Sequence, residues 1–135
     1  MNDDERRSAG RRRRAQAQGP KSDTLQDIFR SLDPQMADWA DRFIFGEVWE
    51  RPGLEHEERM LVAIAALAAI GSTDMLRNYL WGALHSGIPP QKVQETLVML
   101  TVYAGFPRSV DAMRAWREVV LSARRHGMSV DVEVS

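Results

Sequence analysis

The chain has 135 residues, 44% of them hydrophobic and 27% charged, which is the composition of one ordinary folded domain. It contains no cysteine, so disulfides, thiolate metal ligands and cysteine nucleophiles are excluded. The longest apolar run, residues 60–70, is too short to cross a bilayer, and no export segment is readable at the start. We therefore expect a cytoplasmic protein without a membrane partner.

Charge is distributed unevenly along the chain. Residues 1–21 hold seven basic side chains against three acidic ones, a balance of +4, which leaves −5 for the rest of the net charge of −1. Little in this segment is apolar, and we expect residues 1–21 to be a disordered basic tail. Its four consecutive arginines can attract nucleic acid. However, no aromatic residues interleave with them and the body is acidic, so nucleic acid is not an expected partner.

Helical periodicity begins after this segment. Leu25, Ile28, Phe29 and Leu32 recur at helical spacing, and Asp23 is the expected cap of their helix. The next helix is marked by an aspartate followed by a proline at positions 33 and 34. We expect it to run to residue 45 and to end at the glycine that follows.

The longest apolar segment belongs to a helix expected over roughly residues 55–70. Its first turn is acidic, which suits the positive end of the helix dipole. Its second half is apolar on every side, so we expect it to lie in the centre of the fold and to end at Gly71.

Three further helices complete the pattern. They are expected over residues 74–86, from Pro90 to about residue 104, and over residues 108–126, with breaks at Gly87, Gly105 and Gly127. No strand-rich region or short repeat interrupts them. We predict an all-α fold in which residues 22–128 form one domain of about six helices, followed by a tail over residues 129–135.

The segment 45–53 carries the first candidate site residues. Glu47 is a candidate general acid or base, and Trp49 a candidate pocket wall. Arg51 precedes a proline and a glycine, and a guanidinium on such a stiff turn suits bidentate binding of a substrate carboxylate. The alternative is that Arg51 forms a structural ion pair with Glu47, Glu50 or Glu55.

The remaining candidates lie further along the chain. His85, near a helix end, is a candidate proton donor, whereas His56 and His126 are expected to be solvated. The three histidines lack the spacing of metal ligands, so no metal site is expected. The further candidate substrate-binding residues are Arg77, Trp81 and Tyr103.

Two blocks of sequence are distinctive in composition and separation. The first reads Phe-Gly-Glu-Val-Trp-Glu-Arg-Pro-Gly-Leu over residues 45–54 and leads through Arg59 into the apolar run 61–69. The second reads Val-Tyr-Ala-Gly-Phe-Pro over residues 102–107. With Leu76, Arg77 and Gly87 between these blocks, residues 33–122 resemble the carboxymuconolactone decarboxylase family.

The resemblance implies an all-helical homo-oligomer (a dimer, trimer or hexamer) that decarboxylates a small lactone acid without metal or organic cofactor. A sister branch, similar to alkylhydroperoxidase D, uses a relay of glutamate, two cysteines and histidine. This chain has Met60, Ser72, Met75 and Tyr79 at those positions. A thiol peroxidase needs a thiolate nucleophile, so that activity is excluded.

The decarboxylase branch commonly has histidine at the position of Tyr79 and asparagines at those of His85 and Ser86. We therefore expect a cofactor-free lyase or isomerase acting on a small carboxylated lactone or enolisable acid. In this mechanism Arg51 holds the carboxylate, His85 or Glu47 protonates the carbanion or enolate, and Tyr79 polarises a carbonyl. A cyclisation, isomerisation or dehydration in a secondary pathway is an open variant, and a non-catalytic ligand-binding or assembly protein is the alternative.

Overall fold

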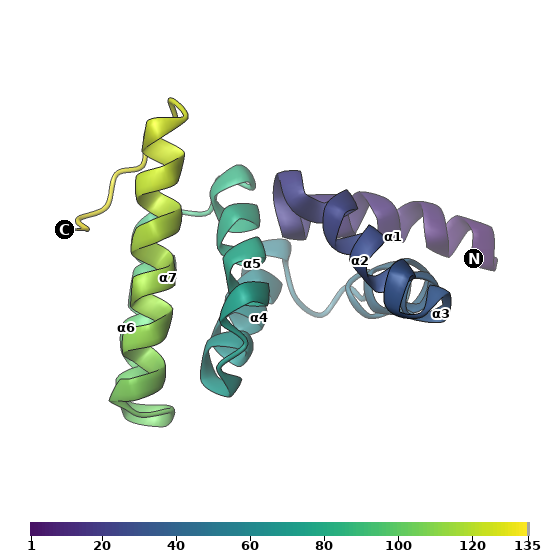
Figure 1. Ribbon diagram of the computed structural model, residues 1–135. Helices are drawn as coiled ribbons and strands as arrows, with labels where there is room; N and C mark the ends of the chain where they lie inside the picture. The colour runs from purple at the N-terminus through teal and green to yellow at the C-terminus, as the bar shows by residue number, and fades with distance from the viewer. Residues whose placement is uncertain (135) are drawn as a thin grey trace.

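The computed structural model describes residues 1–134, which form an all-helical fold as predicted (Figure 1). Two segments depart from α-helical geometry: η1 is a short 3₁₀ helix, and η2 is a π-helix. The elements in chain order are α1 (Asp3–Gln18), η1 (Gly19–Lys21), α2 (Ser22–Leu32), α3 (Pro34–Trp39), η2 (Ala40–Val48), α4 (His56–Ile70), α5 (Thr73–His85), α6 (Pro90–Tyr103) and α7 (Phe106–Arg125).

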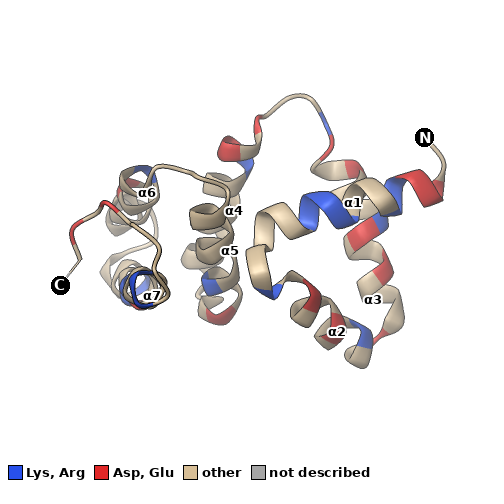
Figure 2. Cartoon of the chain, turned by 90° about the horizontal axis from the view of Figure 1, so that it is seen from above, with Lys and Arg blue, Asp and Glu red and all other residues tan. Residues whose placement is uncertain are grey.

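The helices form three groups that lie side by side (Figures 1 and 2). Helices α6 and α7 pack together at one end, α4 and α5 lie in the middle, and α1, α2, α3 and η2 form the other end. The core lies between α4, α5, α6 and α7, and its largest fully buried side chains include Met60, Ile64, Leu80, Leu97 and Trp116.

Local capping explains most of the helix boundaries. The Asp33 carboxylate accepts a hydrogen bond from the Gln35 N–H at 2.8 Å, which confirms the predicted start of α3. Glu55 and Glu58 form a reciprocal capping box at the start of α4. Gly71 ends α4 in the left-handed conformation, with φ of 78°.

Gly46 does not end its helix, contrary to the prediction. After α3 the chain continues as the π-helix η2 to Val48, and Trp49 donates its N–H to the Ile44 carbonyl five residues earlier, at 2.9 Å. Gly46 is buried, and a Cβ there would lie 2.4 Å from the carbonyl oxygen of Arg6. Gly46 therefore allows α1 to pack closely against η2, and it does not end the helix.

The prediction of a disordered tail over residues 1–21 is wrong, because α1 is a docked helix. The Asn2 side chain caps α1 by accepting from the Glu5 N–H at 2.8 Å. Arg14 is only 4% exposed, and its Nε donates to Asp41 Oδ1 at 2.6 Å. Two more arginines of α1 pair with acidic residues beyond it: Arg7 with Asp38 of α3, and Arg13 with Glu50 in the turn after η2. Figure 2 shows the basic stretch of α1 facing the segments that carry acidic residues.

Helix α1 approaches its neighbours at positions where only glycine fits. A Cβ on Gly10 would lie 1.7 Å from the Asp41 carbonyl oxygen, and one on Gly82 would lie 1.7 Å from that of Ala17. These contacts fix α1 against η2 at one point and against α5 at another. The N-terminal segment is therefore part of the fold and not an appendage.

The sequence predicted that the second half of α4 is buried on every side, but part of its surface is exposed. Met60 and Ile64 are fully buried, but Val62 is 60% exposed and Ile70 is 70% exposed. Helix α4 contacts α5, α6 and α7, and these neighbours leave one apolar face uncovered. In the described part of the chain, none of the helices is long and apolar enough to cross a membrane.

The docking of α1 can be tested with a matched pair of substitutions. We expect Gly10→Ala to lower the free energy of unfolding by about 1–3 kcal/mol, because the new methyl group overlaps the η2 backbone. Alanine is the better helix former, so an isolated α1 would instead be stabilised. Gly53→Ala, where nothing lies within 4 Å, should change the value by less than about 0.5 kcal/mol. Urea unfolding measures both, and equal effects would contradict the docking.

Candidate active site

The turn between η2 and α4, residues 49–55, borders a cavity that we call the turn cavity. Arg51 donates its N–H to the Val48 carbonyl at 3.3 Å, and the Arg59 guanidinium reaches back from α4 to the Arg51 carbonyl. These bonds hold both arginines beside one opening. The turn cavity has a volume of about 570 Å³ and is lined by Val48, Arg51, Pro52, Gly53, Leu54 and Arg59.

Neither arginine of the turn cavity is paired with a carboxylate within residues 1–134. The alternative for Arg51, an ion pair with Glu47, Glu50 or Glu55, is not found among the described residues. Glu50 pairs instead with Arg13 at 3.2 Å, and Glu55 takes part in the α4 capping box. Two guanidinium groups are therefore available to an anionic ligand at this cavity.

Aromatic rings converge on Trp49, the first residue of the turn. The Trp49 ring centroid lies 5.2 Å from that of Phe45, 6.1 Å from that of His56 and 6.4 Å from that of Tyr79. We call these four side chains the Trp49 cluster. It brings together two of the predicted site residues, Trp49, which directly follows η2, and Tyr79 of α5.

Hydrogen bonds assign the tautomer of His56. Ser86 donates its hydroxyl to the Gln16 carbonyl at 2.9 Å, so its oxygen is left to accept from His56 Nε2 at 3.1 Å. A neutral His56 with a proton on Nε2 has a bare lone pair on Nδ1. This buried Nδ1 has no hydrogen-bond partner among the described residues. It is an acceptor that a ligand or water can satisfy.

Two further buried polar atoms near the Trp49 cluster lack partners in the described residues. Gln18 donates from Nε2 to the Tyr79 hydroxyl at 3.5 Å, but its Oε1 accepts nothing. Arg59, one helical turn after His56, has an unsatisfied Nε. Natural proteins leave few buried polar atoms unpaired, and such atoms gather where ligands bind.

The environment of the cluster holds both titratable side chains neutral near pH 7. Burial raises the pKa of Tyr79 above its usual 10.0, outweighing the opposing hydrogen bond from Gln18, so the hydroxyl keeps its proton. Burial, followed by the positive charge of Arg13, lowers the pKa of His56 below its usual 6.5. His56 was expected to be solvated, and this expectation is wrong.

The other predicted site residues lie elsewhere. Glu47 is exposed, and Tyr103 is 78% exposed at the end of α6. Arg77 pairs with Asp74 at 2.9 Å and with Glu118 at 3.0 Å. His85 and Trp81 stack on each other, with ring centroids 6.0 Å apart, and line a cavity that shares no lining residue with the turn cavity.

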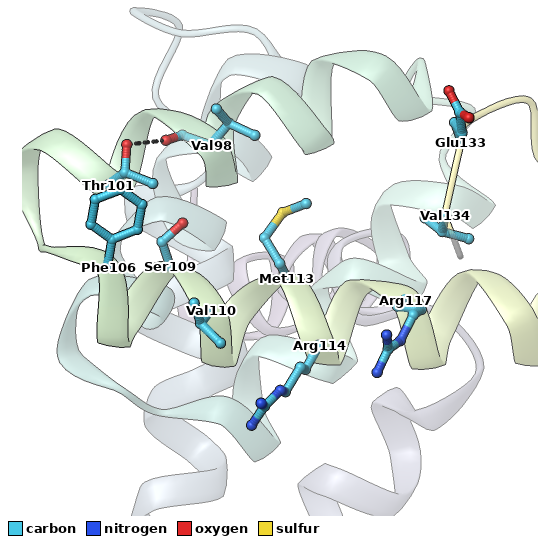
Figure 3. A pocket seen from close by; sticks show the side chains of 10 residues that line it. All are labelled: Val98, Thr101, Phe106, Ser109, Val110, Met113, Arg114, Arg117, Glu133 and Val134. Carbon is cyan, nitrogen blue, oxygen red and sulfur yellow. Dashed lines mark hydrogen bonds between the residues drawn. The ribbon is translucent and has the colours of Figure 1, made fainter.

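A further cavity, of about 410 Å³, lies along α6 and α7 and is closed on one side by Val134 (Figure 3). None of the site residues predicted from sequence is among those that line it. Its walls are mainly apolar: Val98 comes from α6, and Phe106, Val110 and Met113 come from α7, which also carries Arg114 (Figure 3).

The sequence did not single out the polar partners of the Trp49 cluster. Gln16 and Gln18 fall in the segment expected to be disordered, and His56 follows a glutamate and precedes two more. Only Arg59 carried a signal, because it belongs to the first family block. Among the described residues no group of three or more histidine, cysteine or acidic side chains is placed to hold a metal ion.

The lowered pKa of His56 makes stability depend on pH. Below pH 6.5 the unfolded chain gains a proton at this imidazole that the folded chain resists, so the free energy of unfolding should fall as pH drops from neutral through 6.5. His56→Gln should remove this part of the slope. Urea unfolding of both proteins between about pH 5 and pH 8 measures the difference. Parallel curves would contradict a desolvated His56.

Comparison with known proteins gives the chain its family. The model of the carboxymuconolactone decarboxylase family matches residues 34–118. The 4-carboxymuconolactone decarboxylase of Acinetobacter baylyi is 35% identical over 121 residues, covering 88% of this chain and 90% of that protein. The nitrosuccinic acid decarboxylase of Metarhizium robertsii is 28% identical over 78 residues, or 58% of this chain and 52% of that protein. The chain belongs to the carboxymuconolactone decarboxylase family.

Proposed function

We propose that the protein is a cofactor-free decarboxylase of a small carboxylated lactone or enolisable acid, and that the turn cavity binds this substrate. Both relatives are named as decarboxylases, one of a lactone acid and the other of nitrosuccinic acid. The observation that carries the proposal is the pair of arginines without carboxylate partners, Arg51 and Arg59, beside the turn that begins at Trp49. The Trp49 ring in turn contacts those of the buried Tyr79 and the neutral His56.

The first step is substrate binding. Arg51 sits on a turn stiffened by Pro52, so a carboxylate meets a guanidinium that has lost little freedom. Arg59 is already fixed by its bond to the Arg51 carbonyl and offers a second positive charge. Trp49 begins the same turn but does not line the cavity, so the carbon skeleton of the bound acid has to extend from the arginines past Trp49 to reach His56 and Tyr79.

The chemical step breaks the bond between the substrate carbon and its carboxylate, and carbon dioxide leaves. The electron pair of that bond passes into the conjugated carbonyl of the substrate, which becomes an enolate. The neutral Tyr79 hydroxyl donates a hydrogen bond to the enolate oxygen, where charge develops. The carbon then takes a proton from a water molecule at the site, and solvent reprotonates the hydroxide that is left. The bare Nδ1 of His56, which has no partner among the described residues, accepts a hydrogen bond and so orients this water.

The identity of residue 79 bears on which reaction is catalysed. A tyrosine that keeps its proton stabilises an enolate by hydrogen bonding but is a weak acid. The same set of side chains therefore also suits an isomerisation, cyclisation or dehydration that passes through an enolate. Turnover of 4-carboxymuconolactone, compared with that of other enolisable acids, separates these variants.

Arg51 and Tyr79 provide the test of the catalytic proposal. We expect Arg51→Gln to lower kcat/KM for 4-carboxymuconolactone by about 10- to 100-fold, since a charged hydrogen bond contributes about 1.5–3 kcal/mol. Tyr79→Phe should lower kcat by about 10²-fold or more. The matched control is Arg30→Gln, which removes an exposed arginine paired with Asp27 on α2.

Carbon dioxide release measures turnover, and circular dichroism checks that each variant is folded. If no lactone or enolisable acid is turned over while one of them binds tightly, the protein is a ligand-binding member of the family. If Arg51→Gln and Arg30→Gln behave alike, the turn cavity is not the carboxylate site.

Self-association is a second part of the proposal. Apolar side chains are exposed on neighbouring helices, among them Val62 and Ile70 of α4, Val102 of α6 and Phe106 of α7. Such a surface is typical of an interface between copies. We expect light scattering to give a mass two, three or six times the chain mass of 15.3 kDa. Val102→Asp should shift the mass toward that of one chain, and a single chain for the unaltered protein would contradict self-association.

A further inference from the structure

A second cavity, which we call the α5–α7 cavity, lies between the C-terminal ends of α5 and α7 and the η1 turn. Its volume is about 490 Å³, and the residues that line it include Lys21, Trp81, His85, Ser122, His126 and Met128. It has no lining residue in common with the turn cavity. It is large enough for a small organic ligand.

The charged and titratable side chains of the α5–α7 cavity are all basic. Lys21, His85 and His126 line it, and the lining includes no aspartate or glutamate. Lys21 makes no ion pair with any residue between 1 and 134. The chain's other lysine, Lys92, is paired with Glu57 at 3.1 Å. The cavity therefore offers an ammonium group that lacks a counter-ion in the described chain.

The C-terminal end of a helix usually has free backbone carbonyl groups, which favour cations over anions. Here those carbonyls are already occupied. The N–H groups of Gly87 and Ile88 bond to the last turn of α5, and those of Gly127 and Met128 bond to the last turn of α7. This closure reduces the electrostatic objection to a bound anion.

A hydrogen bond shows which ring nitrogen of His126 carries the proton. Its Nδ1 lies 2.7 Å from the Ser122 carbonyl oxygen, which can only accept, so Nδ1 carries a proton. Nε2 is consequently the nitrogen left for a ligand. It donates a hydrogen bond to an anion when the imidazole is protonated.

The remaining lining is mostly apolar. Trp81 and His85 stack with an interplanar angle of 29°, and Pro20, Ser122, Ala123 and Met128 complete the surface. Indole and thioether groups favour planar unsaturated ligands. We propose that the α5–α7 cavity binds a small planar carboxylate, aromatic or conjugated, with its anionic end on Lys21 and its ring against Trp81. This ligand site is separate from the turn cavity and does not depend on the proposed decarboxylation.

The test uses 2-naphthoate and its uncharged analogue 2-naphthamide, with binding to the full chain measured by calorimetry. We expect 2-naphthoate to bind at millimolar concentrations or below and 2-naphthamide to bind at least about tenfold more weakly. Lys21→Met should weaken 2-naphthoate at least about tenfold, and Trp81→Leu should weaken both compounds. Lys92→Met is the matched control and should leave binding unchanged.

Three results would overturn the proposal: no binding at millimolar 2-naphthoate, equal binding of the two compounds, or equal binding to the parent and to Lys21→Met. Loss of binding in Arg51→Gln, but not in Lys21→Met, would place the ligand in the turn cavity instead. Lys21 is exposed, so its substitution leaves folding intact. Because binding and not turnover is measured, failure of the proposed decarboxylation would leave this test valid.

Discussion

The buried pair of Arg14 and Asp41 is the interaction on which the arrangement of the N-terminal half depends. Arg14 also donates to the Ser22 carbonyl and hydroxyl, and Gln26 donates to the other oxygen of Asp41. One guanidinium thus ties together α1, the start of α2 and η2. Breaking such a buried pair by removing one partner costs about 3–5 kcal/mol. The same docking brings Gln16 and Gln18 to the Trp49 cluster, so the candidate site depends on it too.

Local signals in the sequence predicted most of the fold. Caps at Asp33 and Glu55 and left-handed glycines such as Gly71 act over a few residues, so they can be read without tertiary information. Helix α1 was missed because its stability comes from distant residues. Arg14 meets Asp41 27 positions later, and Arg13 meets Glu50 37 positions later. Because the sequence does not show these distant partners, the run of arginines was predicted to be a solvated tail.

The candidate site was only partly predicted, because some of its residues are brought together by contacts between distant parts of the chain. The first family block supplied Trp49 and Arg51, and the position of the family histidine supplied Tyr79; the structure joins Trp49 to Tyr79. His56 was missed because its sequence neighbours are acidic, whereas its burial comes from Ser86, 30 residues away, and from Trp49. Conversely, His85 has suitable chemistry in sequence, but the fold places it with Trp81 on another cavity. The spacing of residues along the chain could not show that His56 lies near Trp49 whereas His85 lies at another cavity.

The π-helical geometry of η2 restricts how this segment can change length. A π-helix accommodates an extra residue within its turns, so loss of one residue between Ala40 and Val48 restores ordinary α-helical winding. Everything after the deletion then rotates about the helix axis by about 100° relative to α1. Trp49 would leave the ring of Tyr79, and Arg51 would leave the mouth of its cavity. The segment is thus a fixed spacer, in which the number of residues matters as much as their identity.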